Sequence, residues 1–355
     1  MALRILHLDS GREWRGQQRQ VLLLARGLRE RGYEPLIVGM PESPLVQRSR
    51  ARGVAVSAVR TRGGWDLRAV QRLRALLRTW RPDLVHAHDG RSHALALLAL
   101  IGRRRVPLVV TRRVVTPPRN FLARHGRRAQ FIAISRAVQG GLVAARIPPD
   151  RISVVYSGVP EPQVARPRDW RAEVRWPAES VLCGVVGSVA EREQGTEMLS
   201  EIARRLPPEA RAATRLLILG GRGGGACEIG GVEAFRAGFV DEMHAAIAGL
   251  DLVWHPAPAE GLGTALLDAM ALRVPPIAFA VGGVPELIED GRSGVLVAPG
   301  DVDAFARVAS SLIASPSARE ALGAGGPARA REFGVQRMVA GTEAVYQKAL
   351  APVAR

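Results

Sequence analysis

Two carboxylates that could bind a polar ligand stand eight residues apart in the segment "PAEGLGTALLDAMA" (Pro258–Ala271). Glu260 comes just before a Gly-Leu-Gly-Thr turn, and the apolar residues after the turn predict a helix that begins near Gly263. A helix start presents unpaired backbone N–H groups and the positive end of the helix dipole, which together bind anions. Glu260 can accept hydrogen bonds from sugar hydroxyls. Asp268 lies one turn after Thr264 on the same side and can reach a ribose.

The same segment also has a purely structural interpretation. In that case Glu260 only complements the helix dipole, and Asp268 is a surface residue. Gly261 and Gly263 favour a ligand, because a phosphate or sugar can approach their backbone without a Cβ atom in the way. Taken alone the segment favours the structural interpretation. The elements around the segment are therefore needed to choose between a ligand site and a simple helix start.

Short apolar runs alternate with helical patterns along the 355 residues, which is typical of parallel sheets buried between helices. One of the helical patterns, Asp66–Trp80, has an apolar stripe and an arginine face. The Pro- and Arg-rich stretch Pro160–Pro177 predicts an interdomain linker, and the Gly-rich stretch Gly220–Gly231 predicts a mobile loop. Strands are expected near residues 4–9, 35–40, 54–59, 84–88, 107–111, 131–135, 152–158, 181–188, 215–221, 232–239, 252–257, 275–280 and 294–300.

This alternation predicts an α/β fold with two doubly wound, Rossmann-like domains in tandem. Ligands of such sheets bind at the carboxyl ends of the strands, so the expected site is a cleft between the two domains.

Charge is distributed unevenly over the two halves of the chain. Residues 1–180 hold 34 arginines and 13 acidic residues, whereas residues 181–355 hold 16 Lys/Arg and 20 acidic residues. An arginine-rich proteome explains the choice of arginine over lysine, but it does not explain why only one half is basic. The asymmetry favours an anionic partner for the first half, such as a nucleic acid, a phospholipid surface or an acidic substrate.

Other compositional features limit the class of protein. No apolar run approaches the ~20 residues of a membrane span, and the N-terminus lacks the pattern of a secretory signal. Cys183 and Cys227 show no metal-site or disulfide spacing, so a cytoplasmic location is expected. Aromatic residues make up only 5% of the chain, which argues against nucleic-acid binding by base stacking.

The longer segment "AEGLGTALLDAMALRVPPIAFAVGGVPELIEDGRSGVLVAPGD" closely resembles the donor-binding half of the family 4 retaining glycosyltransferases, which have the GT-B fold. Two acidic residues separated by seven, a Gly-Gly-x-x-Glu turn and the ending "GVLVAPGD" carry this resemblance. In the first half, "EWRGQQRQVLLLARGLRERGYEP" resembles the family's glycine loop and first helix, and "RPDLVHAHDG", "FIAISRAVQ" and "RISVVYSGV" resemble later strand ends. The resemblance covers essentially the whole chain.

The resemblance implies roles for particular residues. Glu260 would contact the donor sugar, and backbone amides of Gly261, Leu262, Gly263 and Thr264 would hold the sugar and diphosphate. Asp268 would hold the ribose, Gly282 and Gly283 would shape the neighbouring turn, and Gly16 would approach the diphosphate. The acceptor side would include Arg15, Gln17, His88 and Arg113. Such enzymes need no metal and no cofactor beyond the sugar nucleotide, so catalysis is mostly positioning and charge stabilisation.

Departures from the family pattern affect residues that bind the donor diphosphate. Ser188 and Gln194 stand where relatives carry an arginine and a lysine, and Asp268 replaces the usual glutamate. Without the two charge-assisted hydrogen bonds that these side chains would make, the binding free energy of the diphosphate is weaker by about 3–6 kcal/mol. The groups that could make up for them are arginines: Arg192, Arg222, Arg15 and Arg112.

A further departure lies at the end of the strand "PLVVTRR", where Arg112 and Arg113 replace a His-containing turn. An arginine can stabilise a leaving phosphate, but it does not accept a proton. We therefore expect Arg112, with Glu260, in the catalytic site. His88 could line the acceptor side or be structural.

These observations predict a metal-independent retaining glycosyltransferase that transfers a sugar from a nucleoside diphosphate donor to a glycan or lipid-linked acceptor, in cell-envelope glycan or lipopolysaccharide-like glycolipid synthesis. Residues 1–165 would bind the acceptor, residues 166–335 the donor, and helix 336–355 would pack back on the first domain. The basic first domain would also bind the inner face of the cytoplasmic membrane. The alternatives are a weakened or inactive protein that partners an active transferase, and, less favoured, a nucleotide-sugar epimerase.

Overall fold

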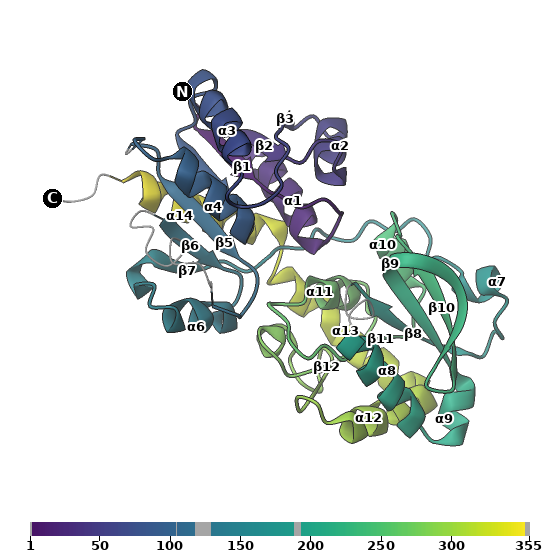
Figure 1. Ribbon diagram of the computed structural model, residues 1–355. Helices are drawn as coiled ribbons and strands as arrows, with labels where there is room; N and C mark the ends of the chain where they lie inside the picture. The colour runs from purple at the N-terminus through teal and green to yellow at the C-terminus, as the bar shows by residue number, and fades with distance from the viewer. Residues whose placement is uncertain (1, 104, 118–128, 188–192, 352–355) are drawn as a thin grey trace. The chain divides into compact units, whose positions relative to one another are not determined.

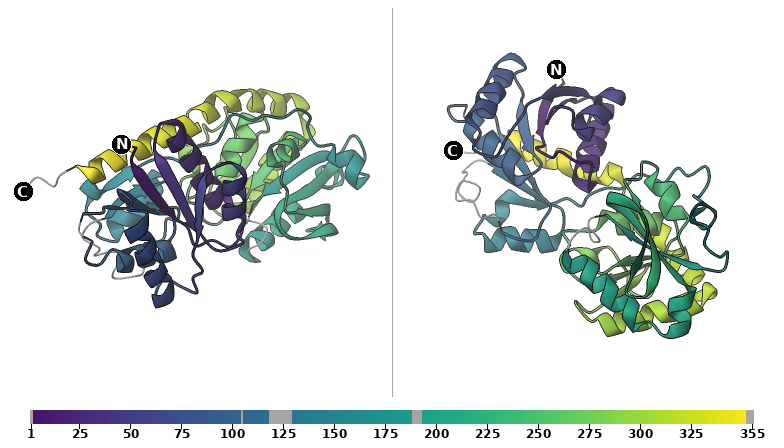
Figure 2. Two further views of the ribbon diagram at one scale, coloured as in Figure 1. Left: turned by 90° about the horizontal axis from the view of Figure 1, so that it is seen from above. Right: turned by 45° about the vertical axis from the view of Figure 1, so that its right-hand side comes forward.

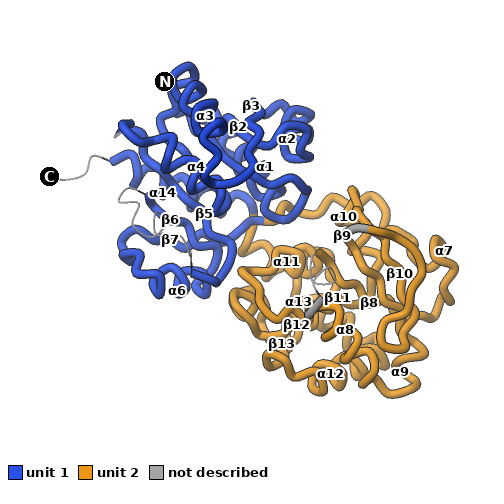
Figure 3. Tube along the Cα trace, in the orientation of Figure 1, with its two compact units in different colours: residues 1–158, 335–355 blue, residues 159–334 orange. Residues whose placement is uncertain are grey.

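The computed structural model describes residues 2–103, 105–117, 129–187 and 193–351, and it divides into two compact units (Figures 1 and 3). Unit 1 comprises residues 1–158 and 335–355, and unit 2 comprises residues 159–334. The sequence places the corresponding boundaries at 165/166 and 335/336. No described helix has the length and apolarity that crossing a bilayer requires.

Unit 1 is built on one parallel sheet of seven strands in the order β3-β2-β1-β4-β5-β6-β7. The strand β1 is the third in this order, because the chain winds first to one side of it, through β2 and β3, and then to the other, through β4 to β7. The strands are β1 (Arg4–Leu8), β2 (Glu34–Gly39), β3 (Ala55–Ala58), β4 (Leu84–Ala87), β5 (Leu108–Arg112), β6 (Ala129–Ala133) and β7 (Ile152–Val154). The helices are α1 (Gly16–Glu30), α2 (Pro44–Ala51), α3 (Leu67–Thr79), α4 (Gly90–Ala99), α6 (Arg136–Ala144), the short η1 (Pro149–Arg151) and α14 (Val335–Leu350).

Local sequence explains where these helices start and which face they bury. The side chain of Asp66 accepts hydrogen bonds from the first N–H groups of α3, as a helix N-cap does. The buried residues of α3 are Ala69, Val70, Leu73 and Leu77, so the expected apolar stripe faces the core. The helix predicted over Asp66–Trp80 is confirmed.

The C-terminal helix α14 belongs to unit 1 although about 180 residues separate it from the rest of that unit (Figure 2). Its buried residues Met338, Val339, Val345 and Tyr346 share one apolar cluster with Ile5, Leu24, Leu28, Leu84, Val109 and Ile132. Contact is close: a Cβ atom added to Gly27 of α1 would lie 2.5 Å from Val339. The helix therefore completes the core beneath the unit 1 sheet.

Unit 2 has a second doubly wound sheet, in the order β10-β9-β8-β11-β12-β13. Its strands are β8 (Val181–Val186), β9 (Thr214–Ile229), β10 (Val232–Gly238), β11 (Leu252–His255), β12 (Pro276–Phe279) and β13 (Val295–Val297). Its helices are α7 (Trp170–Val174), α8 (Glu193–Arg205), α9 (Pro208–Ala213), α10 (Met243–Ala248), α11 (Thr264–Ala271), η3 (Val284–Glu286), α12 (Val302–Ala314) and α13 (Pro316–Arg331). All six residues of β8 are buried, as expected of a central parallel strand.

The prediction of a mobile loop at Gly220–Gly231 is wrong. Most of this stretch is the second half of β9, and Gly225–Ile229 pairs antiparallel with β10. Glycines with positive φ, such as Gly221 at 84°, allow the chain to reverse before this hairpin. Because the backbone of the stretch is paired in the sheet, its glycine content reflects tight turns rather than mobility.

The prediction of a linker at Pro160–Pro177 also needs correction, because most of the segment is packed into unit 2. Trp170 of α7 is 1% exposed, and its Nε1 donates to the carbonyl of Ala246 at 2.9 Å. The Nε1 of buried Trp176 donates to Glu233 at 2.7 Å. Two buried indole rings therefore hold this Arg-rich segment against unit 2.

Candidate active site

The signature loop of unit 2 follows β11, next to the point where the strand order of the sheet reverses. Strand β8 lies in the middle of the order, with β9 on one side and β11 on the other. Such a switch point is where doubly wound sheets bind ligands, at the carboxyl ends of the strands. The loop after β11, residues 256–263, contains Glu260 and leads into α11 at Thr264.

Gly263 is the N-cap of α11 and has a φ of 94°, in the left-handed region. The conformation therefore favours glycine, and a Cβ atom there would also crowd Leu266, at 3.0 Å from its Cδ1. Leu262 is buried, with 1% of its surface exposed. The helix start predicted near Gly263 is confirmed, and the turn exists as the sequence indicated.

Glu260 folds back over this turn. Its Oε1 accepts hydrogen bonds from the N–H groups of Gly261 at 2.8 Å and Leu262 at 3.4 Å, and its Oε2 lies 3.3 Å from Nε2 of His255. Burial alone raises the pKa of Glu260, but the His255 imidazole and these backbone N–H groups outweigh burial and lower the pKa below its usual value. Glu260 is therefore an ionised acceptor whose side chain is still 29% exposed.

The two glycines after β12 support the same loop. Gly282 has a φ of 54°, and the N–H of Gly283 donates to the carbonyl of Glu260 at 3.3 Å. The short helix η3 starts directly after them. The Gly-Gly turn therefore positions the backbone of Glu260 from the neighbouring strand.

Asp268 is not a surface residue, so that part of the structural interpretation is wrong. It lies on the buried side of α11 with 3% of its surface exposed, and its Oδ1 is 3.0 Å from Nε2 of His244 in α10. The carboxylate that the family resemblance assigns to the ribose is thus covered by an imidazole.

The expected diphosphate groups lie largely beyond what the structure describes. Ser188 and Arg192 fall outside the described residues. Gln194 belongs to the first turn of α8, but its side chain, like that of Arg222, is outside the description.

In unit 1 the carboxyl end of β1 carries a polar cluster around Asp9, which is 1% exposed. Asp9 accepts hydrogen bonds from Gln17 Nε2 at 2.6 Å, Gln18 Nε2 at 2.9 Å and the N–H of Gly11 at 2.9 Å. Burial, and then the nearby charge of Asp89, raise the pKa of Asp9. The amide of Gln17, predicted for the acceptor side, is thus held by Asp9 at the edge of the sheet.

The two arginines after β5 differ in their partners. Arg113 Nη1 donates to Ser157 Oγ at 3.1 Å, and burial lowers its pKa to about 10, opposed by the charge of Asp9. Arg112 ends β5, and its Nη2 donates to the carbonyl of Thr116 at 3.0 Å. Both side chains are half-buried cations at the carboxyl edge.

Gly16 and Arg15 mark the start of α1 in the loop after β1. Gly16 is the first residue of the helix and is exposed. The exposed Arg15 forms an ion pair with Glu13 at 2.7 Å. Both belong to unit 1, whereas the Glu260 loop belongs to unit 2.

The prediction that His88 lines the acceptor side requires correction. His88 is 1% exposed, and its Nε2 shares a 3.0 Å hydrogen bond with Nδ1 of His7. His86 bonds to Tyr346 of α14 at 2.6 Å and to Thr111 at 2.7 Å. These three histidines form a buried network that ties α14 to the sheet, so His88 is structural.

The ring nitrogens of His7, His86 and His88 lie within 4.8 Å of one another, a spacing that could hold a metal ion. Burial lowers the pKa of His7 to about 3, and burial together with the positive charge of Arg113 lowers those of His86 and His88. A cation placed here would meet the same desolvation and the same repulsion from Arg113. We therefore interpret the cluster as a neutral hydrogen-bonded network.

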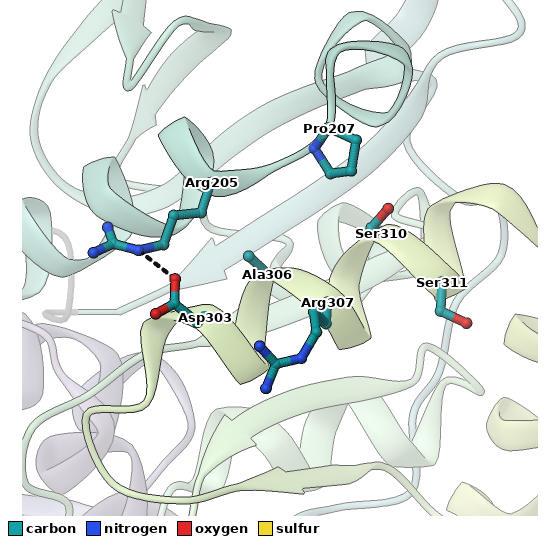
Figure 4. Close-up of a pocket in the computed structure, with 7 residues that line it drawn as sticks. All are labelled: Arg205, Pro207, Asp303, Ala306, Arg307, Ser310 and Ser311. Atoms are coloured by element: carbon teal, nitrogen blue, oxygen red, sulfur yellow. Dashed lines mark hydrogen bonds and ion pairs between the residues drawn. The ribbon is translucent and has the colours of Figure 1, made fainter.

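A surface hollow of about 510 Å³ lies between α8 and α12 (Figure 4). Its rim carries an ion pair of 2.6 Å between Arg205 and Asp303. Its lining comprises Arg205, Pro207, Asp303, Ala306, Arg307, Ser310 and Ser311, none of them a predicted site residue. The hollow is therefore separate from the signature loop.

Sequence reasoning did not identify His244, His255 or Asp9 as site residues. His255 is the last residue of β11, and Asp9 directly follows β1. Their position at the carboxyl ends of central strands is the sequence signal that could have identified them as site residues. His244 lies in a six-residue helix whose packing against α11 no sequence pattern indicated.

Comparison with known families agrees with this geometry. Residues 14–161 match the family model described as Glycosyltransferase Family 4, and residues 180–315 match the model described as Glycosyl transferases group 1. Together the two matches cover well over half of the chain. The protein is a glycosyltransferase, and it belongs to family 4 of the GT-B glycosyltransferases.

Individual relatives have different activities. The chain is 28% identical to the 2-deoxystreptamine N-acetyl-D-glucosaminyltransferase of Streptomyces fradiae, over 84% of this chain and 82% of the relative. It is also 28% identical to the D-inositol 3-phosphate glycosyltransferase of Streptomyces scabiei, over 57% of this chain and 50% of the relative. The chain spans only half of the second protein.

Among solved structures, Anabaena HepE in complex with UDP and glucose superposes with a TM-score of 0.81. The match covers 98% of this chain and 100% of that one, at 19% identity. The predicted two-domain GT-B fold is thereby confirmed.

The lowered pKa of Glu260 makes a testable prediction for the Glu260→Gln variant. The ionised form is favoured in the folded state, so its contribution to stability is complete above the unfolded-state pKa of about 4.3 and is lost as pH falls through the lower folded-state value. Glutamine stays neutral at every pH. We expect the free energy of unfolding of wild type to exceed that of the variant most near pH 7, with the gap closing below about pH 4.5. Urea unfolding at a series of pH values measures this gap, and a gap that widens on acidification would contradict the assignment.

Proposed function

We propose that the protein transfers a sugar from a nucleoside diphosphate donor held by unit 2, with retention of anomeric configuration and without a metal ion. The observation that carries the proposal is the turn between β11 and α11. There an ionised, partly exposed Glu260 lies beside the start of a helix at the switch point of the sheet. The complexes of HepE with UDP and glucose and with UDP-glucose give the proposal further support.

In this proposal Glu260 accepts hydrogen bonds from the hydroxyls of the donor sugar. The backbone N–H groups at the start of α11, with the positive end of the helix dipole, would stabilise the negative charge that the diphosphate gains as the glycosidic bond breaks. The leaving phosphate oxygen takes the proton of the acceptor hydroxyl, and that hydroxyl attacks the anomeric carbon from the face the leaving group departs from. Neither Arg112 nor Arg113 serves as the base, because guanidinium groups do not accept protons.

Arg112 has a complementary role in the proposal. Its guanidinium is half-buried at the end of β5, where a positive charge strengthens the hold on a leaving diphosphate. The Arg112 guanidinium would also offset part of the diphosphate-binding free energy that is lost with Ser188 and Gln194.

The acceptor is proposed to be a glycan or lipid-linked glycan of the cell envelope. Gln17, fixed by Asp9, and Arg113, fixed by Ser157, offer an amide and a cation at the carboxyl edge of unit 1. The main alternative is a weakened relative that supports an active transferase, which the replacements at Ser188 and Gln194 favour.

Turnover assays distinguish these two functions. We expect purified protein, with EDTA present, to release nucleoside diphosphate from one of a panel of UDP-, GDP- and ADP-hexoses when envelope glycan extract is supplied. Proton NMR of the glycan product is expected to show the anomeric configuration of the donor. Arg112→Ala is expected to lower kcat by about 10²- to 10³-fold, as the loss of one charge-stabilising donor does. Arg50→Ala, which replaces an exposed arginine of α2, is the control. No turnover of any donor by folded protein would favour the non-catalytic alternative, and an inverted product would contradict the mechanism.

We further propose that unit 1 binds an anionic lipid surface next to the start of α3. Trp65 is 58% exposed and Leu67 is 71% exposed. Exposed Arg62 and Arg68 lie beside them in sequence, and exposed Arg91 is close in space, because a Cβ atom on Gly64 would lie 3.6 Å from its Cα. Exposed apolar side chains among arginines match the interface of an anionic bilayer, where each cation contributes about 1 kcal/mol.

Vesicle sedimentation tests this surface. We expect binding to vesicles of phosphatidylcholine with phosphatidylglycerol, little binding to phosphatidylcholine alone, and release at high salt. The double variant Trp65→Ser/Leu67→Ser is expected to lose most of the binding. Val143→Ser, which replaces a 44% exposed apolar residue of α6, is expected to keep it. Equal binding of both variants, or no binding by wild type, would contradict the surface.

A further inference from the structure

The carboxyl edge of unit 1 carries hydrogen-bond donors that have no acidic partner. The two carboxylates at this edge, Asp9 and Asp89, are already occupied. Asp9 accepts from two side-chain amides and one backbone N–H, and Asp89 accepts from backbone N–H and hydroxyl groups after β1 and at the start of α4. All of these donors are neutral groups, so the hydrogen bonds of both carboxylates leave the nearby cations without a direct partner.

Arg112 and Arg113 lie at the same edge, and each guanidinium makes one hydrogen bond to a described residue. A guanidinium has five N–H donors, so most of them are unused within the described part of the chain. The Nε atoms of both arginines are buried and have no partner there. Neither guanidinium forms an ion pair with a described carboxylate, and the sequence of segment 118–128, outside the described residues, contains no acidic residue.

The two guanidiniums point to different neighbours. Arg112 Nη1 lies 3.9 Å from the position that a Cβ atom on Gly90 would take, at the start of α4. Arg113 Nη1 instead donates to buried Ser157, which follows β7, at 3.1 Å. Successive residues of an extended chain point to opposite sides, which explains the divergence. Arg113 is therefore available to a ligand group other than the diphosphate proposed for Arg112.

Asp9 places Arg113 next to the amide of Gln17. Burial lowers the pKa of Arg113 to about 10, and the nearby charge of Asp9 opposes this change. Asp9 also accepts a hydrogen bond from Gln17 Nε2 at 2.6 Å, and this nitrogen has a second hydrogen that the bond does not use. Both side chains therefore adjoin the same buried carboxylate, and both can donate to one ligand group.

A half-buried cation selects the charge of its ligand. Burial removes part of the hydration of the guanidinium, and hydrogen bonds between ionised groups are roughly twice as strong as those between neutral groups. An anionic group therefore gains more from Arg113 than a neutral sugar hydroxyl does, and a cationic group is repelled.

We propose that Arg113 binds an anionic group of the acceptor, a phosphate or a carboxylate, with Gln17 as a second donor and Ser157 as the positioning residue behind the guanidinium. The acceptor is then an acidic glycan or glycolipid rather than a neutral one. This inference rests on the proposed function, because it assumes that unit 1 binds the acceptor of a transferase.

Turnover with a fractionated acceptor tests the inference. Envelope glycan extract is separated by anion exchange into a neutral and an acidic fraction, and release of nucleoside diphosphate is measured with each. We expect wild type to have a kcat/KM about tenfold higher for the acidic fraction, the effect of one charge-assisted hydrogen bond. Dephosphorylation of the acidic fraction, or amidation of its carboxylates, should remove this advantage and so identify the anionic group.

Variants of the full-length protein assign the selectivity to Arg113. Arg113→Gln is expected to raise KM for the acidic fraction about tenfold while kcat changes less than about twofold and turnover of the neutral fraction stays as in wild type. Arg113→Lys keeps the charge without the planar fork, so it should retain part of the preference. Ser157→Ala should raise the same KM about threefold, as the loss of a neutral hydrogen bond does. The matched control is Arg50→Gln, an exposed arginine of α2, which should behave as wild type.

The possible failures are distinguishable once thermal unfolding confirms that each variant is folded. Equal turnover of the two fractions by wild type, an advantage that survives both chemical treatments, or an equal loss for both fractions in Arg113→Gln would overturn the inference while leaving the transferase function intact. If wild type turns over neither fraction with any donor, the proposed function fails, and the inference fails with it.

Discussion

The backbone conformation of Gly263 is the constraint on which the site of unit 2 depends. Its φ of 94° turns the chain from the loop after β11 directly into α11, and a side chain at this position would crowd Leu266. Because the turn is tight, the carboxylate of Glu260 reaches the N–H groups of the next two residues and stays ionised. The Gly-Gly turn after β12 donates to the carbonyl of the same glutamate, so two neighbouring strands fix one acceptor group.

Paired side chains, rather than single residues, present the polar groups of both units. In unit 2, His255 supports Glu260, and Asp268 supports His244. In unit 1, Asp9 holds Gln17 and Ser157 holds Arg113, while the neutral histidine network beneath them joins the sheet to Tyr346 of α14. Side chains held by buried partners lose less conformational freedom when a ligand binds, which favours affinity and precise positioning.

Sequence patterns predicted the fold because strand and helix periodicities are local, and the tandem α/β architecture and the helix start at Gly263 follow from them. They did not predict that the glycines of Gly220–Gly231 lie mostly in a paired strand, since that depends on the partner β10. His88 looked accessible at a strand end, but a 3.0 Å bond to His7, 81 residues away, makes it structural. His244 was missed for a similar reason, because only the packing of α10 against α11 brings it to Asp268.

The central claim is that Glu260 recognises the sugar part of a nucleotide-sugar donor at the turn of unit 2. The most direct measurement compares the affinity of wild type and Glu260→Ala for a nucleotide sugar and for the same nucleoside diphosphate without the sugar. The account predicts that the variant binds the nucleotide sugar about 10- to 100-fold more weakly, the effect of charge-assisted hydrogen bonds, while its affinity for the bare diphosphate changes little. An equal affinity of both proteins for the nucleotide sugar would contradict the account.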